Sequence, residues 1–241
     1  MDMPIDMQHQ AMGYDRTATM FSPEGHLLQV EYAEKTVRLG SASIGMVCSD
    51  GVFILADKRI KDKLVVQSSA NKIYEIDSHI VASSAGMVSD ARVLVERAQV
   101  LAQQHRVTYD SPIEPELIIK DIANIKQQFT QYGGARPFAV SLLVAGIKEK
   151  KPELYTSDTT GNYFSYHANA IGENDEKLKE KLREKYRPEN NLKKGVKLAL
   201  DIMKEVQDKG FFQDQLELVY IRNDESKIKR LVGDELKEFL K

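Results

Sequence analysis

Short strands and paired helices come in blocks along this chain of 241 residues, and this order limits the folds that it can adopt. Apolar runs typical of strands are followed twice by two amphipathic helices, rather than by one helix after every strand. The expected strands are 43–48, 52–56, 72–76, 80–85, 138–145, 153–156, 163–167, 216–221 and 228–231, and the expected helices are 88–105, 115–132, 175–186, 192–209 and a last one from residue 234. Paired helices disfavour alternating βαβ units.

The dipeptide Asp50-Gly51 lies between the first two expected strands and predicts a hairpin. Hairpins build antiparallel sheets, and paired amphipathic helices each need a sheet face to cover. The sequence therefore predicts an α+β fold, a four-layer α/β/β/α sandwich of two antiparallel sheets flanked by helices. No linker or internal repeat divides the sequence after Gly40, so residues 41–241 are expected to form one domain.

An N-terminal extension is expected ahead of this domain. The segment Ser22-Pro23-Glu24-Gly25 predicts a tight turn, because proline presets the second position and glycine relieves the fourth. Residues 26–38 have apolar positions at spacings of three and four and predict a helix, which Gly40 ends. Residues 1–40 are thus interpreted as a tail, a turn and an extension helix.

Charge and cysteine content argue against several classes of protein. The 34 Lys and Arg residues against 36 Asp and Glu residues give a net charge of −2, with no positive excess for nucleic acid or an anionic membrane. The longest apolar run, 52–56, is far shorter than the ~20 residues of a membrane helix. Residues 1–13 lack the pattern of a signal peptide, and the single Cys48 fits a reducing compartment. We expect a soluble cytoplasmic protein.

The sequence indicates no metal or cofactor site. None of its five histidines is four residues from another, and no glycine pattern typical of nucleotide binding occurs. Cys48 lies in an apolar run without an adjacent base, which predicts a buried structural residue rather than a nucleophile.

Three residues after the extension point to a particular chemistry. Ser41 follows a glycine at the start of a strand, Asp57 closes the second strand, and Lys72 comes shortly afterwards. This arrangement resembles the proteasome family of N-terminal nucleophile hydrolases. In active β members, cleavage after the glycine frees a threonine, whose own amine then serves as the base. Asp57 and Lys72 match the acid and the lysine of that family, whereas Ser41 stands at the nucleophile position.

The segments ahead of Ser41 resemble the signature of proteasome α subunits, which β subunits lack. These segments are Tyr14-Asp15-Arg16, Phe21-Ser22-Pro23-Glu24-Gly25 and Leu28-Gln29-Val30-Glu31-Tyr32-Ala33. Residues 84–92 and 131–138 are also similar to α subunits. The resemblance extends from about Met12 to the final helix and favours the archaeal type.

The resemblance implies a noncatalytic α subunit, with the threonine active sites on β subunits. Such subunits form seven-membered outer rings, template the β rings, and close the axial pore with their N-terminal tails. Their outer surface receives the C-terminal tails of an activating ATPase. The implied partners are therefore other α subunits, β subunits, that ATPase and unfolded proteins in transit, without nucleic acid, membrane or cofactor.

Two groups of residues match functional positions of the α family. Tyr14, Asp15, Pro23 and Tyr32 match the cluster that supports the gate. Lys72, Gly86 and Met87 match the pocket that receives the tail of the ATPase. In that pocket an ammonium group pairs with the terminal carboxylate, a glycine admits a peptide backbone, and a methionine offers an adaptable apolar wall.

Two other readings of the same residues compete with this one. The chain would be an N-terminal nucleophile peptidase if removal of residues 1–40 exposed Ser41, although that segment does not resemble a disposable propeptide. It would be a soluble sandwich of another kind if the motif matches were fortuitous.

Overall fold

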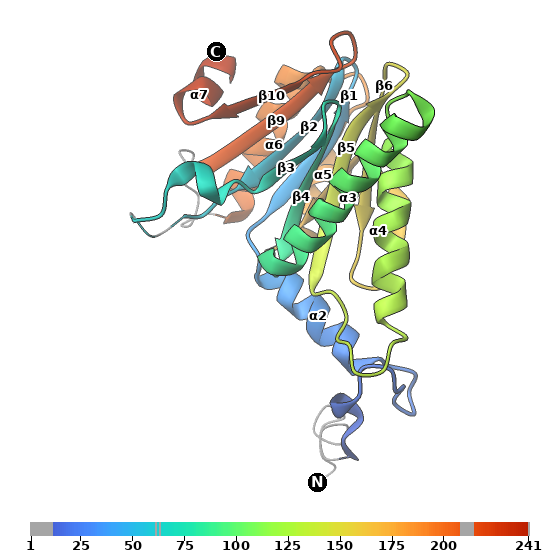
Figure 1. Ribbon diagram of the computed structural model, residues 1–241. Helices are drawn as coiled ribbons and strands as arrows, with labels where there is room; N and C mark the ends of the chain where they lie inside the picture. Colours follow the sequence, from blue (N-terminus) through green and yellow to red (C-terminus); the bar gives the residue numbers. More distant parts are fainter. Residues whose placement is uncertain (1–11, 61, 63, 208–214, 241) are drawn as a thin grey trace.

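Two five-stranded antiparallel sheets form the centre of the molecule (Figure 1). The computed structural model describes residues 12–60, 62, 64–207 and 215–240. The first sheet has the order β10-β9-β2-β1-β8, with β1 (Ser43–Cys48), β2 (Gly51–Asp57), β8 (Ala168–Ile171), β9 (Leu216–Arg222) and β10 (Ile228–Val232). The second follows chain order, with β3 (Ile73–Asp77), β4 (Ile80–Gly86), β5 (Val140–Lys148), β6 (Lys151–Ser157) and β7 (Tyr163–Ser165).

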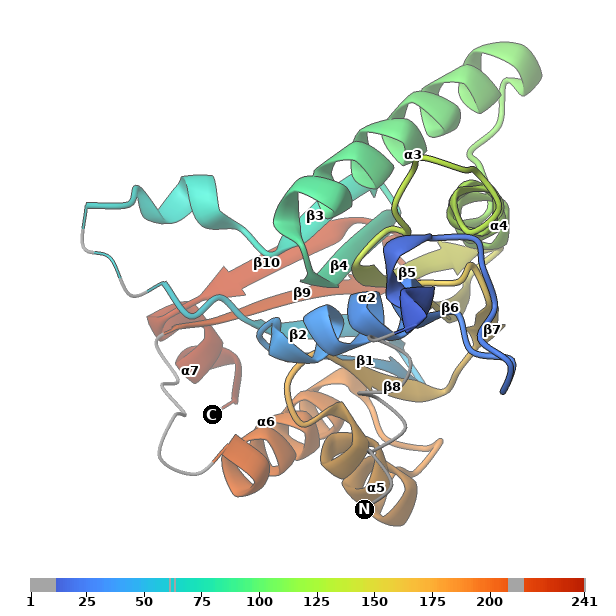
Figure 2. The ribbon, with the colours of Figure 1, turned by 90° about the horizontal axis from the view of Figure 1, so that it is seen from below.

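Helices cover the outer face of each sheet (Figure 2). The helices α3 (Val88–Tyr109) and α4 (Pro115–Phe129) lie on the second sheet, and α5 (Asp175–Lys185), α6 (Leu192–Gln207) and α7 (Asp234–Leu240) lie on the first. The helix α2 (Leu28–Leu39) and the short 3₁₀ helices η1 (Tyr14–Arg16) and η2 (Gln67–Ala70) complete the described elements. The predicted four-layer α/β/β/α sandwich is confirmed.

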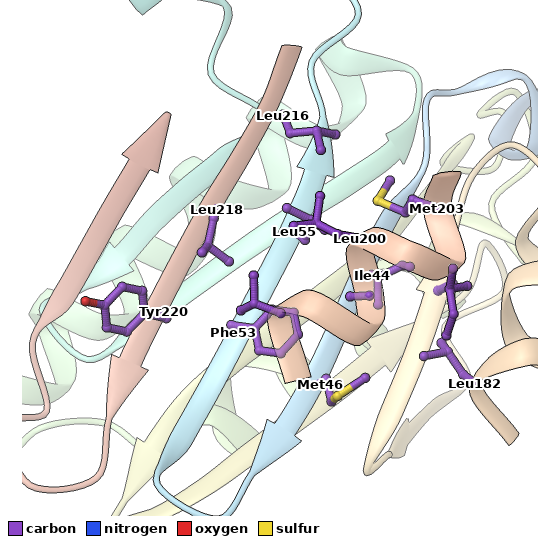
Figure 3. Close-up of a cluster of buried hydrophobic side chains, with 14 of the residues drawn as sticks. Ile44, Met46, Phe53, Leu55, Leu182, Leu200, Met203, Leu216, Leu218 and Tyr220 are labelled. Carbon is purple, nitrogen blue, oxygen red and sulfur yellow. The ribbon is translucent and has the colours of Figure 1, made fainter. Parts of the chain in front are cut away.

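Three apolar clusters fill the spaces between the four layers. In the outer layer of the first sheet, Phe53 and Leu55 of β2 pack with Leu200 and Met203 of α6 (Figure 3). The next residues along β2, such as Ile54, point the other way and join the central cluster between the sheets. Full burial of a side chain of this size contributes about 1.5–3 kcal/mol, so β2 stabilises two layers at once.

The helix α2 closes one end of the central cluster. It contacts β4 and β5 of the second sheet, and its residue Val37 is 8% exposed and belongs to the cluster between the sheets. The exposed positions of the same helix include Lys35 and Arg38. This amphipathic pattern is the one that the sequence predicts for residues 26–38.

The strand expected over 163–167 is shorter in the structure, because β7 ends at Ser165 and the chain then passes to the first sheet, where the unpredicted strand β8 begins at Ala168. Tyr166 donates its backbone N–H to the carbonyl of Leu154 in the second sheet, whereas His167 accepts one from Val47 in the first. The strand β8 then pairs with β1. Tyr166 and His167, where the chain passes from one sheet to the other, continue the aromatic pattern of β7. The sequence pattern therefore did not reveal the change of sheet.

Two helix ends also differ from the expected ones. The helix α3 continues to Tyr109 rather than ending at residue 105, and it stops where Asp110 adopts a left-handed φ of 51°. The helix α4 ends at Phe129, before the glycine pair at 133–134, because Thr130 already bonds the carbonyl of Gln127 in a tighter turn. The last two residues expected in the helix 192–209 lie outside the described residues.

Candidate functional site

The chain passes from α2 into β1 through a tightly packed glycine. Gly40 accepts a hydrogen bond at its carbonyl from the N–H of Glu173 at 2.7 Å. A Cβ atom at this position would lie 2.5 Å from the backbone nitrogen of Gly86, so a larger residue would displace that strand end. The junction between the extension and the domain is thus fixed from two sides.

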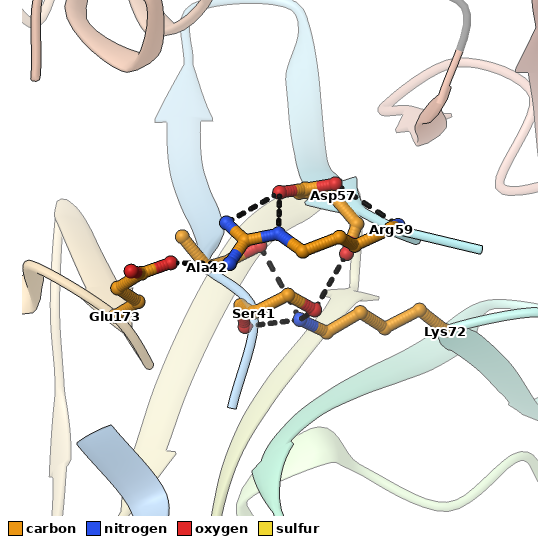
Figure 4. A network of polar contacts seen from close by, with 6 residues as sticks. All are labelled: Ser41, Ala42, Asp57, Arg59, Lys72 and Glu173. Atoms are coloured by element: carbon orange, nitrogen blue, oxygen red, sulfur yellow. Dashed lines mark hydrogen bonds and ion pairs between the residues drawn. The ribbon is translucent and has the colours of Figure 1, made fainter. Parts of the chain in front are cut away.

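Ser41, the next residue, lies within hydrogen-bond distance of Lys72 (Figure 4). The Nζ atom of Lys72 is 2.6 Å from the Oγ atom of Ser41, and it also donates to the carbonyl oxygens of Ser41 and, at 3.4 Å, of Ala42. The Ser41 hydroxyl donates to the carbonyl of Asp57 at 2.7 Å. The sequence-predicted trio of Ser41, Asp57 and Lys72 is therefore brought together.

An ion-pair network surrounds the carboxylate of Asp57. The guanidinium of Arg59 donates to that carboxylate from Nε at 3.1 Å and from Nη2 at 2.9 Å. Its Nη1 atom donates to Glu173 at 2.5 Å. Burial lowers the pKa of Arg59, but the hydrogen bonds and charges of Glu173 and Asp57 outweigh burial and raise it. Arg59 therefore neutralises the carboxylate of Asp57.

Lys72 has an unusual protonation equilibrium for a lysine. Burial lowers the pKa of its amine to about 7; the Asp57 charge opposes this shift and the Arg59 charge adds to it. Within hydrogen-bond reach of a hydroxyl, such an amine could act as a base, or it could stay protonated and bind an anion. An incoming carboxylate would favour the protonated form.

A surface pocket of about 430 Å³ opens beside these residues. The charged side chains in its described lining are all cationic, namely Lys58, Lys72 and Arg92. Its wall also includes Tyr74, Ala85 and Val88, which supply apolar surface. This combination suits an anionic group that carries an apolar chain.

The pocket contains two of the three residues predicted for it. Lys72 and Gly86 both line it, and Gly86 has a φ of +113° that favours glycine. Met87 follows Gly86 and is 38% exposed, but it is not part of the lining, where Val88 and Arg92 contribute instead. Sequence reasoning missed Lys58 and Arg92, although a search for further cations near Lys72 would have included Lys58.

The residues predicted to support a gate lie at the start of the described chain. Tyr14 and Asp15 are in η1, Pro23 is in the exposed turn, and Tyr32 is in α2. The turn has the expected form, since Gly25 donates its N–H to the carbonyl of Ser22 at 2.9 Å and has a φ of +85°. The helix α2 contacts η1, so the helix of Tyr32 lies against the turn of Tyr14.

Cys48 is buried as predicted, and burial raises the pKa of its thiol to about 12, which suppresses the reactive thiolate. Within the described residues, no group of three or more His, Cys, Asp or Glu side chains could hold a metal ion. In the same part of the chain, no helix is both long and apolar enough to cross a membrane.

Comparison with known proteins identifies first the family of proteasome subunits and then the α type within it. Residues 37–221 match the family model of proteasome subunits, and residues 14–35 match the model of the N-terminal signature of A-type proteasome subunits. The proteasome alpha subunit of Archaeoglobus fulgidus is 42% identical over 229 residues, which cover 95% of this chain and 93% of that protein. The corresponding values are 41%, 95% and 93% for the alpha subunit of Methanosarcina acetivorans and 42%, 95% and 87% for that of Pyrococcus abyssi.

The chain belongs to the proteasome α-subunit family. Its resemblance to archaeal α subunits is confirmed, and the reading of fortuitous motif matches is excluded.

Proposed function

We propose that this chain is a noncatalytic α subunit of a cytoplasmic core proteasome. It forms the seven-membered outer ring, templates the β ring, gates entry of unfolded proteins and docks an ATPase activator. The family membership and the names of the archaeal relatives support the α-subunit role. The active sites then lie on β subunits.

The packing of the segment ahead of Ser41 carries the noncatalytic assignment. An N-terminal nucleophile needs a free amine beside its hydroxyl, which requires cleavage after Gly40. That cleavage would release α2, whose Val37 fills the central cluster, and would break the bond from Glu173 to the Gly40 carbonyl. Retention of α2 and Gly40 therefore stabilises the fold, and in the proposed function the nitrogen of Ser41 stays in a peptide bond.

An exposed apolar stripe on α3 supports assembly with other proteasome subunits. Val93, Val100 and Val107 recur every seven residues and are 51%, 50% and 87% exposed. Residues at this spacing lie on one face of a helix. A row of apolar side chains facing water suits a subunit interface better than a free surface.

For the gate we propose the tail and its supporting cluster. Residues 1–40 form the gate region, ahead of a sandwich domain over 41–241. The tail is directed by the turn at Pro23 and supported by Tyr14, Asp15 and Tyr32. Most of the tail, residues 1–11, lies outside the described residues. The contact between η1 and α2 supports a common scaffold for this cluster.

For docking we propose that the pocket of Lys72 and Gly86 receives the C-terminal tail of the ATPase, with Met87 at its rim. The terminal carboxylate pairs with Lys72, and the lack of acidic side chains in the described lining favours that charge. When the tail docks, its terminal carboxylate replaces one of the oxygen atoms that accept hydrogen bonds from the Lys72 ammonium.

One observation favours the second candidate, a peptidase that uses Ser41. Its Oγ atom lies 2.6 Å from the Nζ atom of Lys72, which is close enough for proton transfer. This candidate requires loss of residues 1–40, so the two functions differ in the mass of the chain.

The test combines intact mass with peptidase activity of the purified chain and of its Ser41→Ala variant. The proposed function predicts that the chain retains residues 1–40, assembles into rings in native mass spectrometry, and does not hydrolyse fluorogenic peptides. Loss of the extension, together with turnover that disappears in Ser41→Ala, would establish the peptidase instead.

A further inference from the structure

Glu217 is a buried acid that contacts Lys72 from the other sheet. It lies on β9 and is 0% exposed, yet its Oε2 atom accepts a hydrogen bond from the backbone N–H of Lys72 at 2.9 Å. Its Oε1 atom pairs with the Nη1 atom of Arg230 on the neighbouring β10. A carboxylate in the core of a sheet is costly unless it is paired, so these two partners account for its burial.

Arg230 extends the contact to the residues that follow Lys72. Its Nη2 atom donates to the carbonyl of Ile73 at 3.1 Å and to the carboxylate of Glu75 at 3.2 Å. The first sheet therefore holds the N–H of Lys72 and the carbonyl of Ile73. Lys72 directly precedes β3, the edge strand of the second sheet, and Ile73 is the first residue of that strand.

The backbone of Lys72 is held from a further side as well. Its carbonyl accepts a hydrogen bond from the Oγ atom of Ser83 at 3.2 Å, and Ser83 in turn bonds the hydroxyl of Ser43 at 2.9 Å. With both backbone polar groups fixed, the side chain leaves in one direction and reaches Ser41. The position of the ammonium group thus depends on where the backbone of residue 72 is held.

The charge of Arg230 also extends to the pocket itself. Burial lowers the pKa of Lys58, and the positive charge of Arg230 lowers it further. Neither Glu217 nor Arg230 is part of the described pocket lining. Their effect on a bound tail would therefore pass through Lys72 and Lys58.

We propose that Glu217 and Arg230 are positioning residues for the activator pocket, because they fix the point from which the Lys72 side chain starts. The hairpin β9–β10 is then part of the docking apparatus although it does not touch the tail. This inference rests on the proposed role of Lys72 in receiving a terminal carboxylate.

The test uses assembled core particles that carry Glu217→Gln or Arg230→Lys. The matched control is Glu75→Gln, which also alters a partner of Arg230 but is a surface ion pair with no bond to Lys72. The probe is a synthetic peptide with the C-terminal sequence of an archaeal proteasome-activating ATPase. We expect Glu217→Gln to weaken its binding by about tenfold, as for residues that share one hydrogen-bond network, and Arg230→Lys to weaken it less. Glu75→Gln should leave it unchanged.

A second readout needs no peptide. Acetylation by acetic anhydride, followed by mass spectrometry over a range of pH, reports how accessible and how basic each lysine is. In Glu217→Gln and Arg230→Lys, the profile of Lys72 should move toward that of the exposed Lys120 on α4. A general loss of stability would not change the acetylation profile of Lys72 alone.

Peptide binding and acetylation test two claims separately. The first claim is that Lys72 receives the tail of the ATPase, and the second is that Glu217 and Arg230 position Lys72. If Lys72→Ala binds the peptide normally, the docking role fails, and the acetylation profile alone decides whether Glu217 and Arg230 position Lys72. If the Glu217→Gln particle does not assemble, Arg230→Lys decides in its place. If the peptide affinity and the acetylation profile of Lys72 in the Glu217→Gln and Arg230→Lys particles both match those of the unmodified particle, the inference is wrong.

Discussion

The Nζ atom of Lys72 lies 2.6 Å from the Oγ atom of Ser41, and two carbonyl oxygens accept its other hydrogens. An ammonium group has three N–H donors, so all of them have acceptors before a ligand binds. Of the three acceptors, the carbonyl of Ala42 is the most distant, at 3.4 Å. A carboxylate that enters the pocket is therefore expected to replace this weakest contact while Ser41 continues to hold the lysine.

Substitution of Lys72 tests the proposed docking role. Removing one partner of a desolvated charge pair costs ~2–5 kcal/mol, so Lys72→Ala should weaken each tail site by about 30-fold or more. Lys72→Arg keeps the charge but changes its shape, and we expect a partial defect. The measurement is ATPase-stimulated hydrolysis by assembled particles, with a tail-truncated particle as the control for intact β sites. Normal stimulation of Lys72→Ala particles would remove Lys72 from the docking site.

The depressed pKa of Lys72 predicts that docking depends on pH. Before a ligand binds, the amine loses its proton near pH 7, whereas binding of a carboxylate requires the ammonium form. Above pH 7 binding must therefore take up a proton, and the affinity of the tail peptide should fall as the pH rises toward 9. Arginine stays protonated over this range, so Lys72→Arg particles should show a much flatter dependence. Titration calorimetry in buffers of different ionisation enthalpy measures the proton uptake; equal pH dependence in the two particles would contradict the assignment.

Removal of residues 1–13 tests the proposed gate. We expect faster hydrolysis of a long unfolded protein and unchanged hydrolysis of a very short peptide, since the β active sites are not altered. Tyr32→Ala, which leaves the tail in place but removes a proposed support, should shift the same ratio in the same direction. If the truncation leaves long-substrate hydrolysis unchanged, the tail does not limit entry.

Lys126 provides a prediction about stability. It lies on α4 and is 0% exposed, and its Nζ atom donates to the carbonyls of Val140 at 3.0 Å and Asp158 at 2.9 Å. Burial lowers its pKa to about 7, against the opposing charges of Asp158 and Asp90. Between this value and the ordinary lysine pKa the unfolded chain binds more protons than the folded one, so this group makes the free energy of unfolding rise with pH above 7.

The matched pair Lys126→Met and Lys120→Met separates this contribution from that of any other lysine. Lys120 is an exposed residue of the same helix. Denaturant unfolding at pH 7, 8 and 9 should show a flatter rise in stability for Lys126→Met and an unchanged one for Lys120→Met. Equal slopes in both variants would show that Lys126 does not titrate in this range.

Local patterns were sufficient for most of the secondary structure and for the layers. The helix α2 begins and ends within two residues of the predicted range, and the hairpin at Asp50-Gly51 joins β1 and β2 as predicted. These features depend on neighbours in the sequence. The crossing at Tyr166 depends instead on strands far away along the chain, so no local pattern indicates it.

The site was predictable only where a motif fixed it. Ser41, Asp57 and Lys72 were found from the family pattern, but Asp57 is paired with Arg59, which also bonds Glu173, and the backbone of Lys72 is held by Glu217. The positions of Glu173 and Glu217 follow from the packing of distant segments. The sequence gives a weak indication that Lys126 is buried. It lies four residues after Ile122 and three before Phe129, on the apolar face of α4, where a lysine must either reach the surface or find partners.

The most direct test of the noncatalytic assignment compares two matched particles assembled from this chain and an archaeal β subunit. One particle carries Ser41→Ala in this chain, and the other carries an alanine in place of the N-terminal threonine of the β subunit. We predict that the first hydrolyses peptides like the unmodified particle, that the second does not, and that native mass spectrometry finds residues 1–40 on every copy of this chain. Loss of hydrolysis in the Ser41→Ala particle, with residues 1–40 removed from the unmodified one, would contradict the account.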